Sequence, residues 1–216
     1  MSASKPKQDW ADWAEQRLLD AAILRSPDLG FTPALLKAAG EACDLSEGDV
    51  GLLLPNGPAD LVALLSRRHD EKTMETLAGL DVSQAAKIRQ KIFEGVSARL
   101  EAAAADLEAS KRAAGFLTLP QNLGLAGRLT WESADRIWRW AGDTATDENH
   151  YSKRAILSGI LAPALTMRLF DGREPAEAFV AARIENVMAF EKWKGGIKVS
   201  EPLKAAAEAL AKMRYR

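Results

Sequence analysis

The sequence predicts an all-α protein, on three observations. Ala, Leu, Glu, Lys and Arg, which favour helices, are abundant. Runs of alternating β-branched or aromatic residues, which are typical of strands, are absent. Finally, Ile88, Ile92, Val96 and Leu100 recur every four positions, as expected on one face of an amphipathic helix. We therefore expect helices throughout the chain and no sheet.

The length and composition are those of a packed helical protein. Its 216 residues are 47% hydrophobic, which is enough for a substantial core. A net charge of -1, from 29 basic and 30 acidic residues, provides no overall field that would attract nucleic acid or anionic membrane. No stretch approaches the roughly 18 uninterrupted apolar residues of a membrane span, and the first ten residues lack the apolar core of an export signal.

Two capping signals place the first short helices. After a helix over about residues 8–25, Thr32 and Pro33 form an N-cap and first-position pair that opens a helix ending near Gly40. Ser46, with Asp49 three residues later, resembles a capping box at the start of a third helix.

Prolines and glycines predict where the later helices begin and end. Pro55 stops the third helix, Asn56 caps a fourth that reaches about residue 78, and the next is a long helix from Val82 into the alanine run. The helices that follow span about 113–119, 123–141 with Gly142 as the stop, 146–170, 174–194 and 200–216. We divide the chain into a helix-turn-helix-like module at 1–78, a helical domain at 79–198 and an amphipathic helix at 199–216.

The order of short helices resembles the DNA-binding region of TetR-type regulators. Where those proteins usually carry Thr, Tyr and Lys contacts to DNA, this chain has Asp49, Gly51 and Gly57. Residues 26–65 contain six acidic residues and one lysine, a local charge of -5, whereas phosphate binding requires the opposite sign. We expect a degenerate helix-turn-helix that binds no nucleic acid, and a TetR-like ligand-responsive transcriptional regulator stays the alternative function.

No motif in the sequence is typical of a catalytic or metal site. His69 and His150 are the only histidines, and neither has a second histidine or a Glu-x-x-His partner at helical spacing. Gly-x-Ser-x-Gly, a phosphate-binding glycine loop and Cys-x-x-Cys are absent. We predict that the protein is not an enzyme and uses no metal or other cofactor.

Three motifs in the second half carry a specific resemblance. They are Leu119-Pro-Gln-Asn122, Trp138-Arg-Trp-Ala-Gly-Asp143 and Thr146-Asp-Glu-Asn-His-Tyr-Ser-Lys-Arg-Ala155. Their co-occurrence resembles the signature of the Coq-nine family. Weaker resemblance extends to Leu18-Leu-Asp-Ala-Ala22 and to Arg183-Ile-Glu-Asn-Val-Met-Ala-Phe190.

This resemblance implies both a fold and a function. The fold would be TetR-like and usually homodimeric, with an apolar cavity for isoprenoid lipid in its C-terminal part. The function would be that of a non-enzymatic accessory protein of ubiquinone (coenzyme Q) biosynthesis. It would bind isoprenoid quinone intermediates and present them to the demethoxyubiquinone hydroxylase at the membrane.

An isoprenoid tail requires a long dry slot, and the helices over 123–141 and 146–170 carry enough apolar side chains to line one. The residues that we assign to lipid binding are Leu129, Trp138, Ile156, Ile160, Leu161, Leu165 and Leu169. The same residues would equally fill an ordinary core, so a structural partner of a helical enzyme, without lipid, is a third possibility.

The resemblance places a partner-binding patch around the start of the 146–170 helix. Its residues here are Asp143, Asp147, Asn149, His150, Tyr151 and Arg154. The family commonly has Phe and Trp where this chain has Glu148 and His150. Because exposed aromatic side chains are typical interface anchors, their replacement predicts an altered docking face.

The last segment resembles the amphipathic helix with which the family binds the membrane. From Lys192 onward the chain has seven basic and two acidic residues, a local charge of +5, which favours binding to anionic lipid. We assign membrane binding to Leu203, Lys204, Leu210, Lys212 and Met213. Docking of this apolar stripe onto the rest of the protein is the alternative. We expect a cytoplasmic protein, peripheral to the inner (plasma) membrane of a bacterium.

Overall fold

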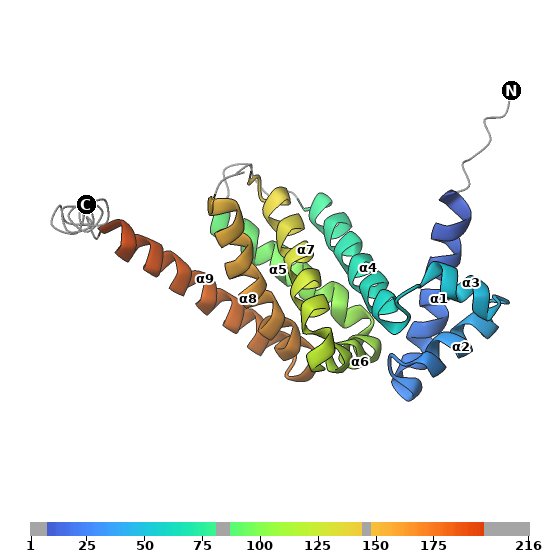
Figure 1. Ribbon diagram of the computed structural model, residues 1–216. Helices are drawn as coiled ribbons and strands as arrows, with labels where there is room; N and C mark the ends of the chain where they lie inside the picture. The colour runs from blue at the N-terminus through green and yellow to red at the C-terminus, as the bar shows by residue number, and fades with distance from the viewer. Residues whose placement is uncertain (1–7, 81–86, 144–147, 197–216) are drawn as a thin grey trace, which may run out of the picture. The chain divides into compact units, whose positions relative to one another are not determined.

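The computed structural model describes residues 8–80, 87–143 and 148–196, and these residues form helices and turns with no strand (Figure 1). The all-α prediction is therefore confirmed. The helices are α1 (Gln8–Leu29), α2 (Pro33–Ala42), α3 (Glu47–Leu53), α4 (Pro58–Ala78), α5 (Ile88–Ala105), α6 (Leu107–Leu117), the 3-10 turn η1 (Pro120–Asn122), α7 (Leu123–Trp140), α8 (Glu148–Phe170) and α9 (Arg173–Gly196).

The predicted caps of α2 and α3 are confirmed. The Thr32 side chain accepts a hydrogen bond from the backbone N–H of Leu35. Ser46 and Asp49 form the reciprocal capping box, with each side chain accepting from the other residue's backbone N–H. The two helices pack closely, because a Cβ atom added at Gly40 would lie 2.8 Å from the Cγ2 of Val50.

The predicted cap of α4 is wrong. Its N-cap is Gly57, whose φ of 62° is a conformation that favours glycine, and Pro58 takes the first helical position. Asn56 lies one residue earlier, where its backbone N–H and its side-chain amide both donate to the carboxylate of Asp60. The Asn56 side chain therefore donates to Asp60 in the first turn of α4 and does not accept a hydrogen bond from the helix backbone as an N-cap would.

The predicted long helix into the alanine run is confirmed over the described residues, because α5 ends at Ala105, the last alanine of the run. The predicted start of the next helix near Ala113 is wrong, because α6 starts at Leu107. Between them Asp106 adopts a non-helical conformation, and its carboxylate lies 2.9 Å from the Nε2 of His69. Ser110 then donates a hydrogen bond across the break to the carbonyl of Ala103. These two contacts hold the break at Asp106, directly after the last alanine of the run.

Four helices form the bundle that positions the candidate site. Helices α4, α5, α7 and α8 lie side by side, and α6 packs against one end of them as well as against α1 (Figure 1). Gly95 on α5 permits the closest approach, because a Cβ atom there would lie 2.6 Å from the Cγ2 of Ile137 on α7. Ile92, Val96 and Leu100 are buried in this bundle, whereas Ile88 at the start of α5 is exposed.

The chain divides into two compact units, Met1–Val180 and Ala181–Arg216. Helix α9 begins in the first unit and continues into the second. The predicted helix at 200–216 lies outside the described residues. The boundaries at 78 and 198, the TetR-like arrangement and the homodimer stay predictions.

Candidate functional site

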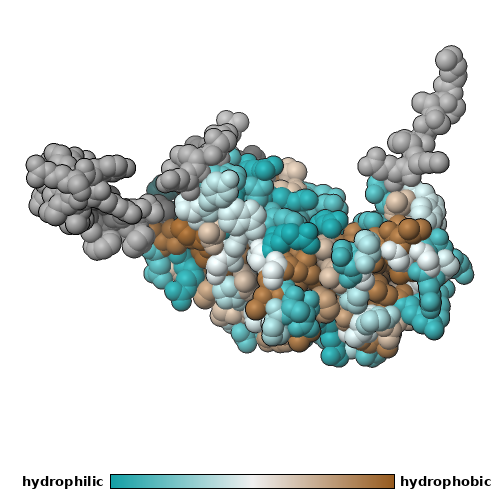
Figure 2. Space-filling view, viewed as in Figure 1, coloured by the Kyte–Doolittle hydropathy of each residue, from teal (hydrophilic) through white to brown (hydrophobic). Residues whose placement is uncertain are grey.

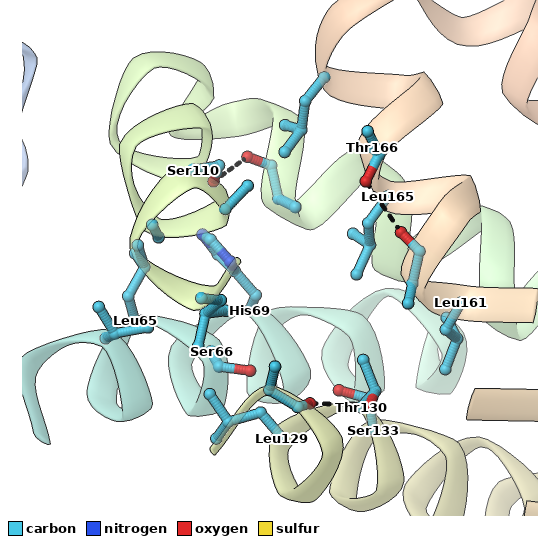
Figure 3. Close-up of a pocket in the computed structure, with 18 of the residues that line it drawn as sticks. Leu65, Ser66, His69, Ser110, Leu129, Thr130, Ser133, Leu161, Leu165 and Thr166 are labelled. Atoms are coloured by element: carbon cyan, nitrogen blue, oxygen red, sulfur yellow. Dashed lines mark hydrogen bonds between the residues drawn. The ribbon is translucent and has the colours of Figure 1, made fainter. Parts of the chain in front are cut away.

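The first unit contains a cavity of about 270 Å³ between α4, α5, α6, α7 and α8. Figure 3 shows how the helices contribute: Leu65, Ser66 and His69 extend from α4, Leu129, Thr130 and Ser133 from α7, and Leu161, Leu165 and Thr166 from α8. Most of the lining surface is apolar. This volume lies near the lower end of ligand pockets, which is roughly 300 Å³.

The cavity has a buried interior and an exposed mouth. Leu65, Leu129 and Leu161 in its wall are at most 4% exposed. Thr118, Leu123 and Ala162 also line it but are exposed to solvent, so they mark the mouth. Hydrophobic side chains reach the surface over α7 in the view of Figure 2, flanked by hydrophilic ones. The cavity therefore joins a solvent-exposed mouth to a buried, mostly apolar interior.

A polar cluster lies in the buried part of the wall. The Nε of Arg99 donates to the Oδ1 of Asp70 at 2.7 Å, and the Nη2 of Arg99 donates to the Oγ of Ser66 at 3.2 Å. The Oγ of Ser133 donates to the same Asp70 oxygen at 2.6 Å. Arg99 and Asp70 are 4% and 2% exposed, so this is a buried ion pair that joins α4 and α5, with α7 attached through Ser133.

His69 stands beside this pair and is neutral at physiological pH. Burial, followed by the positive charge of Arg99, lowers the pKa of His69 to about 4, although the hydrogen bond and charge of Asp106 act in the opposite direction. The imidazole is 3% exposed and lines the cavity. Among the described residues that line the cavity, Arg99 is therefore the one with a formal charge, and Asp70 behind it compensates that charge.

Four of the seven residues assigned to lipid binding line the cavity: Leu129, Leu161, Leu165 and Leu169. The other three lie outside its wall. Ile160 is buried, Ile156 is 42% exposed, and Trp138 is half-buried at the end of α7. Lipid contact by any of the seven stays a prediction.

The motif residues at the end of α7 and in α8 form a network that we call the α7–α8 clasp, made of Asp135, Trp138, Asp143, Lys153 and Arg154. The Nε and Nη1 of Arg154 donate to Asp135 at 2.6 Å and to Asp143 at 2.9 Å. Lys153 donates to the other oxygen of Asp143 at 2.6 Å, and the Nε1 of Trp138 donates to the carbonyl of Lys153. The clasp holds together the two helices that supply the leucines of the cavity wall.

The turn that precedes Asp143 explains two further motif positions. Gly142 has a φ of 95°, which favours glycine, and it ends α7 as predicted. The backbone N–H of Asp143 then donates to the carbonyl of Trp138 at 3.0 Å. Burial alone would raise the pKa of Asp143, but the hydrogen bonds from Lys153 and Arg154 outweigh it and leave that pKa below its usual value.

The residues assigned to partner binding differ in accessibility. The side chains of Asp143 and Arg154 are only 5% and 1% exposed, because they face each other inside the clasp. Tyr151 is 64% exposed, and its ring contacts those of Trp131 and His150. The backbone of Asn149 is helical, but its side chain lies outside the described residues, as does Asp147. Partner binding by this set stays a prediction.

The sequence prediction missed the polar cluster, although a signal was present. Arg99 lies three residues after Val96 and seven after Ile92, on the apolar stripe of α5, and Ser133 lies midway between Leu129 and Ile137 on α7. A charged or polar residue at such a position must be paired when it is buried. His69 also belongs to this end of the cavity rather than to a metal site.

The membrane and metal predictions concern other parts of the chain. Leu203, Lys204, Leu210, Lys212 and Met213 lie outside the described residues. No helix among the residues that the structure describes is long and apolar enough to cross a bilayer. Within 8–80, 87–143 and 148–196, no group of three or more His, Cys, Asp or Glu side chains could hold a metal ion.

Comparison with known proteins identifies relatives of the chain. The family model of COQ9 matches residues 123–191, which cover α7, α8 and most of α9. A ubiquinone biosynthesis protein COQ9 of Xenopus tropicalis, described as mitochondrial, is 28% identical over 182 residues, or 81% of this chain and 57% of the relative. Its counterparts in rat and human are 28% and 26% identical over 68% of this chain and 48% of theirs.

The chain thus spans about half the length of the curated relatives that it matches. The matched segment contains the α7–α8 clasp and the α7 and α8 walls of the cavity. On these matches, the chain is similar to COQ9 proteins over most of its length, and its second half matches the COQ9 family model.

Proposed function

We propose that this chain is a lipid-binding accessory protein of ubiquinone biosynthesis that does no chemistry itself. The relatives named for ubiquinone biosynthesis support the pathway. The observation that carries lipid binding is the cavity of about 270 Å³, whose interior is lined by leucines of α4, α7 and α8. The ligand class that fits an apolar interior with one polar end is an isoprenoid quinone intermediate.

The size and mouth of the cavity limit how much of such a ligand it holds. At about 270 Å³ it accommodates a ring and the first part of a prenyl tail, so the remainder of a long tail would leave through the mouth near Leu123 and Ala162. A lipid held in this way is shielded from water, and its ring would pass out through the same mouth to reach a second protein. We therefore propose that the protein presents its lipid to the demethoxyubiquinone hydroxylase at the membrane surface.

The face that would meet the hydroxylase includes Tyr151 and Ile156. Both are exposed on α8, at 64% and 42%, and large exposed apolar side chains are typical interface anchors. They lie on the helix that carries both the clasp and a wall of the cavity, so docking there would be coupled to the ligand site. The buried Asp143 and Arg154 would act indirectly, by holding this helix in place.

Ubiquinone synthesis in cells tests this function. A strain that lacks its own COQ9-family protein and makes little ubiquinone receives this chain, and quinones are measured by liquid chromatography with mass spectrometry. We expect ubiquinone to rise and the demethoxy intermediate to fall. If the chain is produced and folded but neither quinone pool changes, and the purified protein carries no lipid, the proposal is wrong.

A further inference from the structure

Helix α1 carries large side chains on its solvent-exposed side. Trp10 and Trp13 are 53% and 54% exposed, and Leu24 is 77% exposed. Steps of three, four and seven residues lead from Trp10 to Trp13, to Arg17 and to Leu24, which places all four side chains on one side of the helix. We call this side the α1 tryptophan face.

The α1 tryptophan face is ordered and is separate from the core. The guanidinium carbon of Arg17 lies 4.6 Å from the centroid of the Trp13 ring, so a cation–π contact holds an indole that is still more than half exposed. The opposite side of α1 packs into the core through Leu18, Leu19 and Ala22. The face therefore presents apolar area in a fixed position, as binding surfaces do.

The acidic residues of the chain are concentrated around this face. Residues 8–65 contain ten acidic and three basic residues, a local charge of -7, whereas residues 66–180 contain sixteen of each. Burial raises the pKa of Glu15, and the nearby charge of Asp12 raises it further, although Arg67 acts in the opposite direction. The acids on α1 thus lie close enough to repel one another, and a positive charge brought to them would be attracted.

This charge selects the kind of partner that would cover the face. An anionic membrane or a nucleic acid would be repelled. A second copy would bring the same negative charge to the contact, because a two-fold interface pairs a surface with itself. A helix with an apolar stripe flanked by Lys or Arg would bury Trp13 and Leu24 and place its cations beside acids such as Asp20, whose side chain is 67% exposed.

We propose that the α1 tryptophan face is a docking site for a basic amphipathic helix of another protein. None of the described residues of α1, α2 or α3 lines the cavity, so a helix on this face and a lipid in the cavity do not compete for the same side chains. The inference does not depend on the proposed lipid-binding function. It assigns the helix-turn-helix-like module, whose charge is unsuited to DNA, a partner of opposite charge.

Model peptides of one length test the chemistry of the face. The first is a helical Leu–Lys peptide with its leucines on one side, the second has Glu in place of Lys, and the third is a scrambled Leu–Lys peptide of the same composition. Their affinities for the full chain are measured by fluorescence anisotropy. We expect the Leu–Lys helix to bind at least about tenfold more tightly than either of the others, and added salt to reduce its advantage over the Glu peptide.

Trp13→Ser tests whether binding occurs on this face. Because Trp13 is exposed, the variant should fold, and it should bind the Leu–Lys helix at least about tenfold more weakly. Leu80→Ser is the matched control, since Leu80 is a 42% exposed apolar residue just after α4, outside the acidic residues 8–65. That variant should keep the affinity of the unmodified protein. Equal affinities for the three peptides, or equal losses in the two variants, would overturn the docking site.

Photo-crosslinking in the cells that naturally produce the chain tests for the physiological partner. Benzoylphenylalanine is placed at position 24, on the α1 tryptophan face, and at position 75, an exposed position of α4, as the control. Mass spectrometry should identify at position 24, and not at position 75, a crosslinked peptide with the basic amphipathic helical pattern. Crosslinks at position 24 to lipid, to a second copy or to a peptide without that pattern, or none at all, would each contradict the proposal.

Discussion

The Nη1 of Arg154 on α8 lies 2.9 Å from the Oδ2 of Asp143, which directly follows the turn at the end of α7, and both side chains are almost fully buried. Arg154 also binds Asp135 and the carbonyl of His150. Two motif residues that the sequence assigns to a partner surface therefore contact each other. Their first effect is to join the two helices that supply leucines to the cavity.

Arg154→Gln is expected to lower the free energy of unfolding by about 2 to 3 kcal/mol, because it removes the charge-assisted hydrogen bonds to Asp135 and Asp143 and leaves Lys153 as the remaining partner of Asp143. Urea denaturation followed by circular dichroism measures the loss. Arg173→Gln is the control, since Arg173 pairs with Glu177 on the exposed surface, and it should change stability little. Equal stability of the two variants would show that the clasp does not hold the fold.

Tyr151→Ala should affect binding to the hydroxylase and leave the stability of the fold nearly unchanged. Tyr151 is exposed, so the variant loses only ring contacts with Trp131 and His150, and stability should fall by no more than about 1 kcal/mol. Binding to the purified hydroxylase, measured by surface plasmon resonance, should weaken at least about tenfold, as for an interface anchor. Unchanged hydroxylase binding by Tyr151→Ala would remove this face from the proposed docking surface.

Asp70→Asn tests the buried ion pair beside the cavity. The variant removes the charge that compensates Arg99, so the free energy of unfolding should fall by about 3 to 5 kcal/mol. Asp20→Asn removes an acid from the Arg68 pair at the surface, where Asp20 is 67% exposed, and should be nearly neutral. Thermal and urea unfolding of both variants make the comparison, and a neutral Asp70→Asn would contradict the buried pairing.

His69 predicts a pH dependence of stability. Its pKa is about 4 in the folded protein and about 6.5 when unfolded, so the unfolded chain binds more protons between these values. Stability is therefore complete above pH 6.5 and falls as the pH drops towards 4. Between pH 6.5 and 5 the loss from this group is about 1 to 2 kcal/mol.

His69→Gln should remove that part of the slope and keep a donor to Asp106. His150→Gln, at the only other histidine, is the control and should retain the slope. Urea titrations at several pH values measure both. If the two variants have the same slope as the unmodified protein over pH 5 to 6.5, His69 is not the group that titrates.

Local signals in the sequence predicted most helix ends. Thr32 and the Ser46–Asp49 pair cap their helices, and Gly142 ends α7, because each acts through the backbone beside it. The predicted cap at Asn56 and the predicted start of α6 near Ala113 were wrong, because side-chain contacts outside those patterns determine both positions. Asp60 engages Asn56, and His69, 37 residues away in the sequence, binds Asp106.

In the candidate site too, some residues could be predicted from a local sequence pattern and others could not. Leu129, Leu161, Leu165 and Leu169 could be predicted because an apolar stripe on a helix must face the interior. The same stripe did not show which of its apolar residues border a cavity and which, like Ile160, only fill the core. Arg99, Asp70 and Ser133 come from three helices, so their meeting depends on how the bundle packs and not on any one pattern.

The most direct test of lipid binding is lipid analysis of the purified chain and of two variants of α8. Ala162 and Ala155 are both exposed on this helix, but only Ala162 lines the cavity. Ala162→Phe should fill the mouth without disturbing the core, and Ala155→Phe is its matched control. Mass spectrometry of extracts should find isoprenoid lipid, near one molecule per chain, with the unmodified protein and Ala155→Phe, and at least about tenfold less with Ala162→Phe. Equal lipid in all three proteins, or none in any, would contradict a lipid site in this cavity.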